Sequence, residues 1–227
     1  MGERREAGLY LWPERANFGR VVPKGKFYEH GKVNAALRDR FVAEVQRITW
    51  AYKLAESTVG LAGSSAVPEI QVFEVECKGA DVSDVVLAAI DRAVKLPIIF
   101  EVIPNGVAPV RRMAAMPKPS DRGAPKAAGF HSTTWCSGED RRPLPAAIDL
   151  PSLYVALLAP LLPVVTLPGE DAATVAERVE AARRLQREVA TLERTLRNEP
   201  QFNRKVDLRR RLLNTQTTLD ELTSPTT

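Results

Sequence analysis

Glu76 and Lys78 are the residues whose types and spacing could support catalysis, because they form an E-x-K pair in the segment PEIQVFEVECK, residues 68–78. Side chains alternate along a strand, so this pair falls on one face while Phe73 and Val75 fall on the other. In metal-dependent nucleases, carboxylates hold Mg²⁺ and a lysine orients or activates water. The pair therefore indicates one candidate chemistry, metal-assisted hydrolysis of a phosphodiester.

That chemistry also requires an acidic residue on a neighbouring strand, and the sequence offers none in the expected position. Upstream there are Glu69, on the same strand, and Glu56, in a predicted loop. An E-x-K motif is short, and a solvated charged strand face is its more common origin. We therefore expect no catalytic residue, and a divergent nuclease that uses Glu76, Lys78 and Mg²⁺ is the alternative.

Other catalytic or metal sites are not indicated by the residues. His30, His131, Cys77 and Cys136 lack the paired spacing of zinc ligands, and Cys77 falls on the apolar face of its strand. No nucleophile and base stand in a suggestive pattern, and there is no phosphate loop or dinucleotide fingerprint. We expect no cofactor and no bound metal.

Composition and charge are those of a soluble globular protein with a weak basic bias. The first 60 residues hold eleven of the 32 Lys and Arg residues and seven of the 28 acidic ones, so the remaining 21 of each sign balance. The longest apolar run, residues 144–167, is interrupted by prolines, and the charged N-terminus has no apolar segment behind it. Two cysteines suit a reducing compartment. We expect a cytoplasmic protein with no membrane contact.

Cations interleaved with aromatic residues near the N-terminus suggest a nucleic-acid surface, because bases stack on rings while Lys and Arg hold phosphates. The preferred alternative is that Phe27 and Tyr28 anchor this segment to the core. A second basic cluster, which also includes Arg211, lies near the C-terminus, where Glu188, Glu193 and Glu199 would instead neutralise it. The candidate nucleic-acid-binding residues are Arg20, Lys24, Lys26, Tyr28, Arg47, Lys53, Arg204, Lys205, Arg209 and Arg210.

Hydrophobic periodicity predicts an α/β (α+β) fold, a mixed sheet packed with helices. The expected elements are a helix over 34–54, a strand over 68–78, a helix over 81–94, strands over 98–103, 109–116 and 127–135, and a buried helix over 147–160. A right-handed crossover through the second helix makes the first two of these strands parallel.

The C-terminal residues predict an antiparallel helical hairpin of coiled-coil character. Apolar residues keep three-and-four spacing over about 172–197, and a second helix follows over 201–222 after a break at residues 198–200. We therefore divide the chain into a mixed α/β domain, 1–168, and a hairpin, 169–227. Apolar residues near the tip fall off the main seam, which indicates a surface for a partner or for self-association. They are Leu196, Phe202, Val206 and Leu213.

Several segments together resemble a bacterial family of unknown function. They are the lead-in around residues 23–28, the run over 48–54, the strand EIQVFEVECK, the segment LPIIFEV, and EPQFNRKVDLRRRL in the last helix. The resemblance implies a gene encoded beside helicases and DNA methyltransferases in restriction-like or phage-defence clusters, and it supplies no catalytic residues. In other members the final helix is more usually longer and Lys-rich, whereas in this chain its last part is residues 216–222.

The expected function is therefore a non-catalytic accessory subunit of such a defence system. Its expected partners are helicase or DNA methyltransferase components, or a second copy through the C-terminal hairpin, with DNA as a further candidate ligand.

Overall fold

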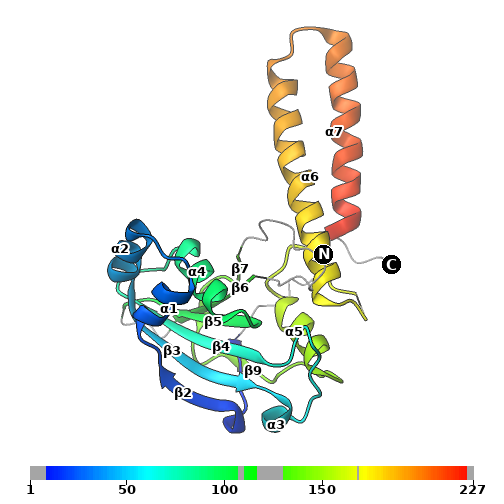
Figure 1. The fold of residues 1–227 in the computed structure, drawn as a ribbon. Helices are drawn as coiled ribbons and strands as arrows, with labels where there is room; N and C mark the ends of the chain where they lie inside the picture. Colours follow the sequence, from blue (N-terminus) through cyan, green and yellow to red (C-terminus); the bar gives the residue numbers. More distant parts are fainter. Residues whose placement is uncertain (1–8, 107–109, 117–129, 168, 224–227) are drawn as a thin grey trace.

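The computed structural model describes residues 9–106, 110–116, 130–167 and 169–223, with the side chain of Val110 left out. Within these residues, seven strands form a mixed sheet in the order β2-β3-β4-β5-β6-β7, with β8 also paired to β6. The α+β class predicted from the sequence is confirmed (Figure 1). The sheet strands are β2 (Asn17–Val21), β3 (Val45–Leu54), β4 (Ile70–Cys77), β5 (Ile98–Ile103), β6 (Val110–Ala115), β7 (His131–Ser132) and β8 (Cys136–Ser137).

The parallel pair at the centre of the sheet is β4 and β5, as predicted. The crossover between them is α4, Asp84–Val94, which Ser83 precedes as N-cap and which ends at Lys95 in a left-handed conformation. Its apolar positions recur at helical spacing, so one side of the helix is buried against the sheet. The strand predicted over 109–116 is present as β6, and it pairs with β5 antiparallel.

The prediction of one helix over residues 34–54 is wrong for its second half. The helix, α2, covers Ala35–Glu44, and the side chain of Asn34 caps it at 2.9 Å from the backbone N–H of Leu37. The remaining residues form β3, which pairs with both β2 and β4.

Bulges in β3 explain why the apolar residues of this strand have a spacing close to that of a helix. Its pairing with β4 shifts register after Val45 and again after Trp50, and each extra residue resets the alternation of faces. The fully buried side chains consequently recur at every third position, which is close to helical spacing. They are Val45, Ile48, Ala51 and Leu54.

One face of the sheet packs against α1 (Lys24–His30), α2 and α4 (Figure 1). The apolar residues of both central strands share this core with apolar residues of α2 and of the first half of β3. The shared residues are Phe41, Val45, Ile48, Phe73, Val75, Ile98, Phe100 and Val102. Phe27 also belongs to this core, at 3 % exposure, so the preferred explanation for the aromatic pair near the N-terminus is confirmed for Phe27.

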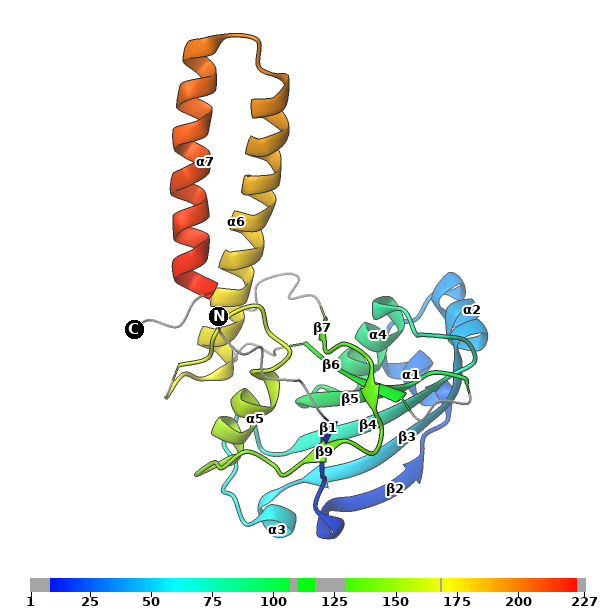
Figure 2. The ribbon, with the colours of Figure 1, turned by 180° about the vertical axis from the view of Figure 1, so that it is seen from behind.

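The opposite face is apolar at one end and charged at the other. Ile70 and Val72 of β4 share a second hydrophobic core with α5 (Leu150–Leu158) and the first turns of α6, and Figure 2 shows α5 beside the sheet. α5 lies within the helix predicted over 147–160 and is shorter at both ends, with Asp149 capping the Ser152 backbone N–H at 2.8 Å. Glu74 and Glu76 continue the same face beyond this core and stay partly exposed. The charged residues on this face of the sheet therefore lie next to a hydrophobic core.

The lead-in and the later loops carry short elements. They are β1 (Leu9–Tyr10), the 3₁₀ helix Glu14–Ala16, α3 (Glu56–Val59) and β9 (Arg141–Arg142), with β1 and β9 paired in parallel. Glu56, expected in a loop, thus begins a short helix. Of the strand predicted over 127–135, residues 127–129 lie outside the described part, and β7 is the part of the remainder that pairs with β6.

The hairpin of α6 (Ala172–Asn198) and α7 (Phe202–Thr223) is confirmed, and it extends away from the sheet (Figures 1 and 2). Its base is anchored, because Val175 and Val179 belong to the same core as α5. Arg178 adds an ion pair with Glu170 at 2.8 Å and donates to the carbonyl of Leu222 at 3.2 Å. The division of the chain at residue 168 stays a prediction, and the core continues across it. No described helix combines the length and hydrophobicity that crossing a membrane requires.

Candidate functional site

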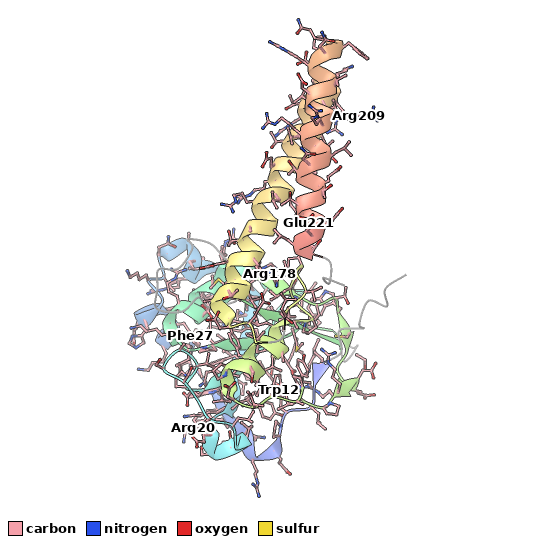
Figure 3. The ribbon with its side chains drawn as sticks, turned by 90° about the vertical axis from the view of Figure 1, so that its right-hand side faces the viewer. Trp12, Arg20, Phe27, Arg178, Arg209 and Glu221 are labelled. Atoms are coloured by element: carbon pink, nitrogen blue, oxygen red, sulfur yellow. The ribbon has the colours of Figure 1, made fainter. Side chains whose placement is uncertain are left out.

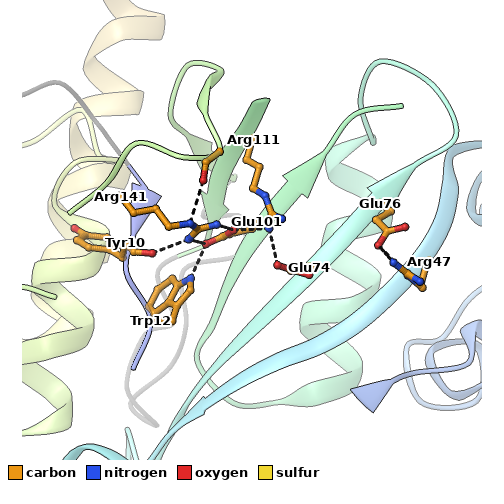
Figure 4. Close-up of polar contacts among 9 residues, drawn as sticks. Tyr10, Trp12, Arg47, Glu74, Glu76, Glu101, Arg111 and Arg141 are labelled. Carbon is orange, nitrogen blue, oxygen red and sulfur yellow. Dashed lines mark hydrogen bonds and ion pairs between the residues drawn. The ribbon is translucent and has the colours of Figure 1, made fainter. Parts of the chain in front are cut away.

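Glu101 is the centre of the charged end of the sheet. It lies on β5, is only 1 % exposed, and its carboxylate accepts four hydrogen bonds (Figure 4). Trp12 donates at 2.5 Å, Arg111 at 2.9 Å, and Arg141 at 2.9 and 2.8 Å through its two terminal nitrogens. A buried charge is tolerated only when it is paired and hydrogen-bonded, and Glu101 meets both conditions.

Arg111 joins Glu101 to a second carboxylate. The parallel register places Glu74 of β4 directly beside Glu101, and Arg111 of β6 donates to Glu74 at 2.5 Å. Two adjacent carboxylates would repel each other, and Arg111 and Arg141 bring the formal charge of the group to zero. Arg141 also donates to the carbonyl of Tyr10 at 2.6 Å. The network therefore fastens β9 and the N-terminal lead-in to the sheet.

The pKa shifts of Glu101, Arg111 and Arg141 favour the charged form of each of these three groups. Burial alone would raise the pKa of Glu101, but the hydrogen bonds and charge of Arg141, with Trp12 and Arg111, outweigh it and lower the pKa. Burial likewise acts to lower the pKa of Arg111, and the two carboxylates reverse this and raise it. A carboxylate whose lone pairs are occupied and whose pKa is lowered is a poor general base. The geometry is that of a structural clamp.

Glu76 and Lys78 lie at the carboxyl ends of the parallel strands, where open α/β sheets commonly bind ligands. They line a shallow recess of about 490 Å³ together with Gln46, Cys77 and residues 103–106. Arg47 of β3 is paired with the Glu76 carboxylate. It donates to this carboxylate from Nε at 2.8 Å and also from a terminal nitrogen (Figure 4). The structure thus places the E-x-K pair beside a recess, with its acid already paired to a cation.

The expectation that no acidic residue lies in position on a neighbouring strand is wrong. Glu101 stands on β5 beside Glu74, two positions from Glu76, and a lone acid in the apolar run 98–103 was the available signal. Arginines hold all three carboxylates. Across the part of the chain that the structure describes, no three His, Cys, Asp or Glu residues form a group suited to a metal ion.

The residues considered for zinc lie apart. His30 ends α1 at the surface, whereas His131 lies on β7 and Cys136 on β8. Cys77 is the last residue of β4, its side chain is 4 % exposed, and burial raises the pKa of its thiol to about 12. A thiol with that pKa is protonated at neutral pH and is neither a ligand nor a nucleophile.

The N-terminal cations predicted to bind nucleic acid are partly committed to other contacts. Lys24 donates to the carbonyl of Val45 at 2.5 Å, and burial together with the charge of Lys78 lowers its pKa. Lys26 pairs with Glu29 at 3.6 Å. Lys24 is therefore committed to the backbone of β3, whereas Lys26 and Glu29 form an exposed and weak ion pair.

The other candidates of this group surround the same edge of the sheet. Arg20 on β2 lies over the ring of Phe18, 4.7 Å from its centroid, and Tyr28 on α1 lies under Arg38. Arg47 and Lys53, expected on a helix face, belong instead to β3. Lys53 pairs with Glu69 at 2.5 Å, and Arg47 pairs with Glu76.

The second basic cluster is far from the first. Arg204, Lys205, Arg209 and Arg210 are exposed on α7, and Figure 3 shows Arg209 near the outer end of the hairpin, while Arg20 lies on the opposite side of the sheet body. The structure therefore does not bring the two predicted groups together. Of the neutralising contacts expected here, Arg211 faces Glu188 at 3.9 Å.

Apolar side chains form an exposed stripe on α7. Phe202 is 78 % exposed, Val206 52 % and Leu213 58 %, and at about 100° per residue the three fall within about 40° of one another. We call these three residues the outer stripe. Leu196, predicted to join them, is half-buried on α6.

The outer stripe is distinct from the contact between the two helices. The half-buried seam of α7, made by Leu208, Leu212 and Leu219, lies about 120° away around the helix. Packing against α6 therefore leaves the outer stripe uncovered.

Charge is divided along the hairpin. Its distal half, residues 183–213, holds ten Lys and Arg residues against four acidic ones, for a net charge of +6. The basal parts, residues 172–182 and 214–223, hold one arginine against four acidic residues, for a net charge of −3. The outer stripe lies wholly within the basic half.

The fold and its charged centre define an α+β protein in which a clamped mixed sheet supports a helical arm. The chain belongs to the family described as a domain of unknown function, DUF4391, whose model matches residues 11–219. This confirms the expected membership of a family of unknown function, and the expected gene neighbourhood stays a prediction. No curated protein and no solved structure matches the chain.

Proposed function

We propose that this chain is a non-catalytic accessory subunit that binds a partner protein through its hairpin. The observation that carries the proposal is the outer stripe, three apolar side chains more than half exposed on an arm that extends from the body (Figures 1 and 3). Exposed apolar residues that share one face of a projecting element are typical of interaction sites. The base of the arm packs in the core, which fixes where the arm leaves the body.

The sheet supports this proposal by the way its charged residues are used. Glu101 and Glu74 are held by Arg111 and Arg141, and Glu76 is held by Arg47. Acids that are already paired with arginines serve to position the lead-in and strands. The alternative, a Mg²⁺-dependent nuclease that uses Glu76 and Lys78, has less support because the Glu76 carboxylate that would bind the metal is already paired with Arg47.

The cellular setting is part of the same proposal. The resemblance places members beside helicases and DNA methyltransferases, so we propose a cytoplasmic subunit of a restriction-like defence system that binds one of those components. The basic residues Arg204, Lys205, Arg209 and Arg210 make DNA a second candidate ligand, since a row of cations gains free energy on a phosphate backbone by counterion release.

The test is co-purification with the products of the adjacent genes. The full chain is compared with a variant in which a four-residue Gly/Asn turn replaces residues 187–212. This shorter hairpin retains Val175, Val179 and Ala182 in the core, and circular dichroism checks its fold. We expect a helicase or methyltransferase component to co-purify with the full chain and to be lost with the short hairpin. Equal recovery with both proteins would move the interface to the sheet domain and contradict the proposal.

A further inference from the structure

We infer that the outer stripe of α7 docks an amphipathic helix of a partner protein whose apolar face is flanked by acidic residues. This rests on the proposed function and names the chemistry of the partner. The outer stripe already has the pattern of one side of a helix-in-groove contact, in which anchors recur at three-and-four spacing along a helix.

Arg209 gives this surface its specificity. Phe202, Val206, Arg209 and Leu213 follow one another at spacings of four, three and four, so at about 100° per residue the guanidinium of Arg209 interrupts the apolar line. Lys205 lies on one flank of the line and Arg210 on the other. A complementary helix presents apolar side chains to the stripe, a carboxylate opposite Arg209, and further carboxylates at its edges.

A second copy of this chain does not fit the same surface. The outer stripe lies in the distal half of the hairpin, which carries a net charge of +6. Two hairpins paired through their stripes would bring these basic halves together, whether they run parallel or antiparallel. Like charges across an interface oppose association, and they select against that partner.

A nucleic acid would use only part of the surface. Phosphates pair with Lys205, Arg209 and Arg210 but leave Phe202 and Leu213 in water, and these two are 78 % and 58 % exposed. The cations also continue around the helix at Arg204, which is exposed away from the stripe. A phosphate backbone would use Arg204 as readily as Arg209, whereas a helix docked on the stripe would not reach it. This difference supplies a matched control.

The experiment measures fluorescence anisotropy of three probes with the full-length protein. The first is a designed helical peptide of about 18 residues, with leucines at the stripe spacing, a central Glu and flanking Glu residues. The second has Lys at every Glu position, and the third is a DNA duplex. We expect the acidic peptide to bind at least about tenfold more tightly than the basic one, and Arg209→Glu to weaken it about tenfold.

Two controls fix the interpretation. Arg204→Glu makes the same charge change on the other side of α7 and is expected to alter peptide affinity less than about twofold. A peptide with only its central Glu changed to Lys is expected to recover binding to Arg209→Glu, because such a swap isolates the pairwise interaction. All these positions are exposed, and circular dichroism of each variant verifies that the fold is kept.

Three outcomes would overturn the inference. In the first, Arg209→Glu and Arg204→Glu weaken peptide binding equally. In the second, the acidic peptide does not bind although the DNA duplex does. In the third, light scattering shows a dimer of this chain that Val206→Asp dissociates. If the short hairpin still loses a neighbour-encoded partner while the acidic peptide fails to bind, the proposed function stands and this inference fails. If the peptide binds as expected but no neighbour-encoded protein does, this inference stands and the proposed helicase or methyltransferase partner is wrong.

Discussion

Replacing Glu101 by Gln is the most informative single change to the sheet. Gln keeps the shape of the side chain and leaves an acceptor for Trp12, while it removes the charge that balances Arg111 and Arg141. Both arginines are largely covered, with side chains 25 % and 20 % exposed, so neither regains full hydration. The substitution therefore leaves partly buried cations without their shared counter-ion.

The expected cost follows from those contacts. Breaking a buried ion pair by removing one partner costs about 3 to 5 kcal/mol. The lower end applies here, about 3 kcal/mol, because Arg111 keeps its bond to Glu74 at 2.5 Å. For a domain of this size, about 2 to 4 °C is lost per kcal/mol, so the melting temperature should fall by about 6 to 12 °C.

Urea unfolding followed by circular dichroism measures this change, with Glu76→Gln as the matched control. Glu76 and Arg47 are 26 % and 55 % exposed, and an exposed pair contributes under about 1 kcal/mol. A free energy of unfolding for Glu101→Gln within about 1 kcal/mol of the wild type would refute the clamp, since that is the range of surface sites.

The pH dependence gives a second check on the same residue. The folded-state pKa of Glu101 is lowered below its ordinary value of 4.5 by Arg141, Trp12 and Arg111, which outweigh its burial. Its contribution is therefore complete above the unfolded pKa and is lost as the pH falls through the folded one. The difference in unfolding free energy between wild type and Glu101→Gln should be constant near neutrality and narrow below pH 4.5. A difference that does not narrow there would contradict the assigned ion pairs.

Three further predictions concern the core and the nuclease alternative. Phe100→Ala should cost about 3 to 5 kcal/mol, whereas Val85→Ala, at a half-exposed position of α4, should cost under about 1 kcal/mol; similar losses would contradict the sheet assignment. Because burial raises the pKa of Cys77 to about 12, a disulfide reagent at pH 8 should label it only after unfolding, as thiol counting with and without denaturant would show. Purified protein should not cleave DNA with Mg²⁺ or Mn²⁺, and cleavage that Glu76→Ala and Lys78→Ala abolish would overturn the accessory role.

Much of the fold could be predicted because local and tertiary signals agree. The strand containing Phe73 and Val75, the crossover helix α4 and the hairpin each have a pattern that matches their packing. β3 could not be predicted, because its two bulges are set by pairing with β4 and produce a burial period of about three. Trp50 and its β-branched neighbours favour a strand, and that propensity was the signal available.

The charged centre was missed for a different reason. Arg141 and Trp12 are 40 and 89 residues from Glu101 in the sequence, and only the tertiary fold, with the β1–β9 pairing, brings them to it. Ion pairs between distant residues leave no periodic signal. The outer stripe was easier to predict, because Phe202, Val206 and Leu213 follow the geometry of a single helix, which fixes their shared face before any tertiary contact is known.

The most direct test of the partner-binding role is the affinity of the co-purifying partner for one pair of α7 variants, measured by calorimetry. Val206→Asp puts a charge on the outer stripe, and Thr218→Asp puts the same charge on an exposed position at the other side of the helix. The partner should bind Val206→Asp at least about tenfold more weakly than wild type, a loss of about 1.4 kcal/mol, and should bind Thr218→Asp within about twofold. Equal affinity for both variants and wild type would show that the hairpin's outer stripe is not where the partner binds.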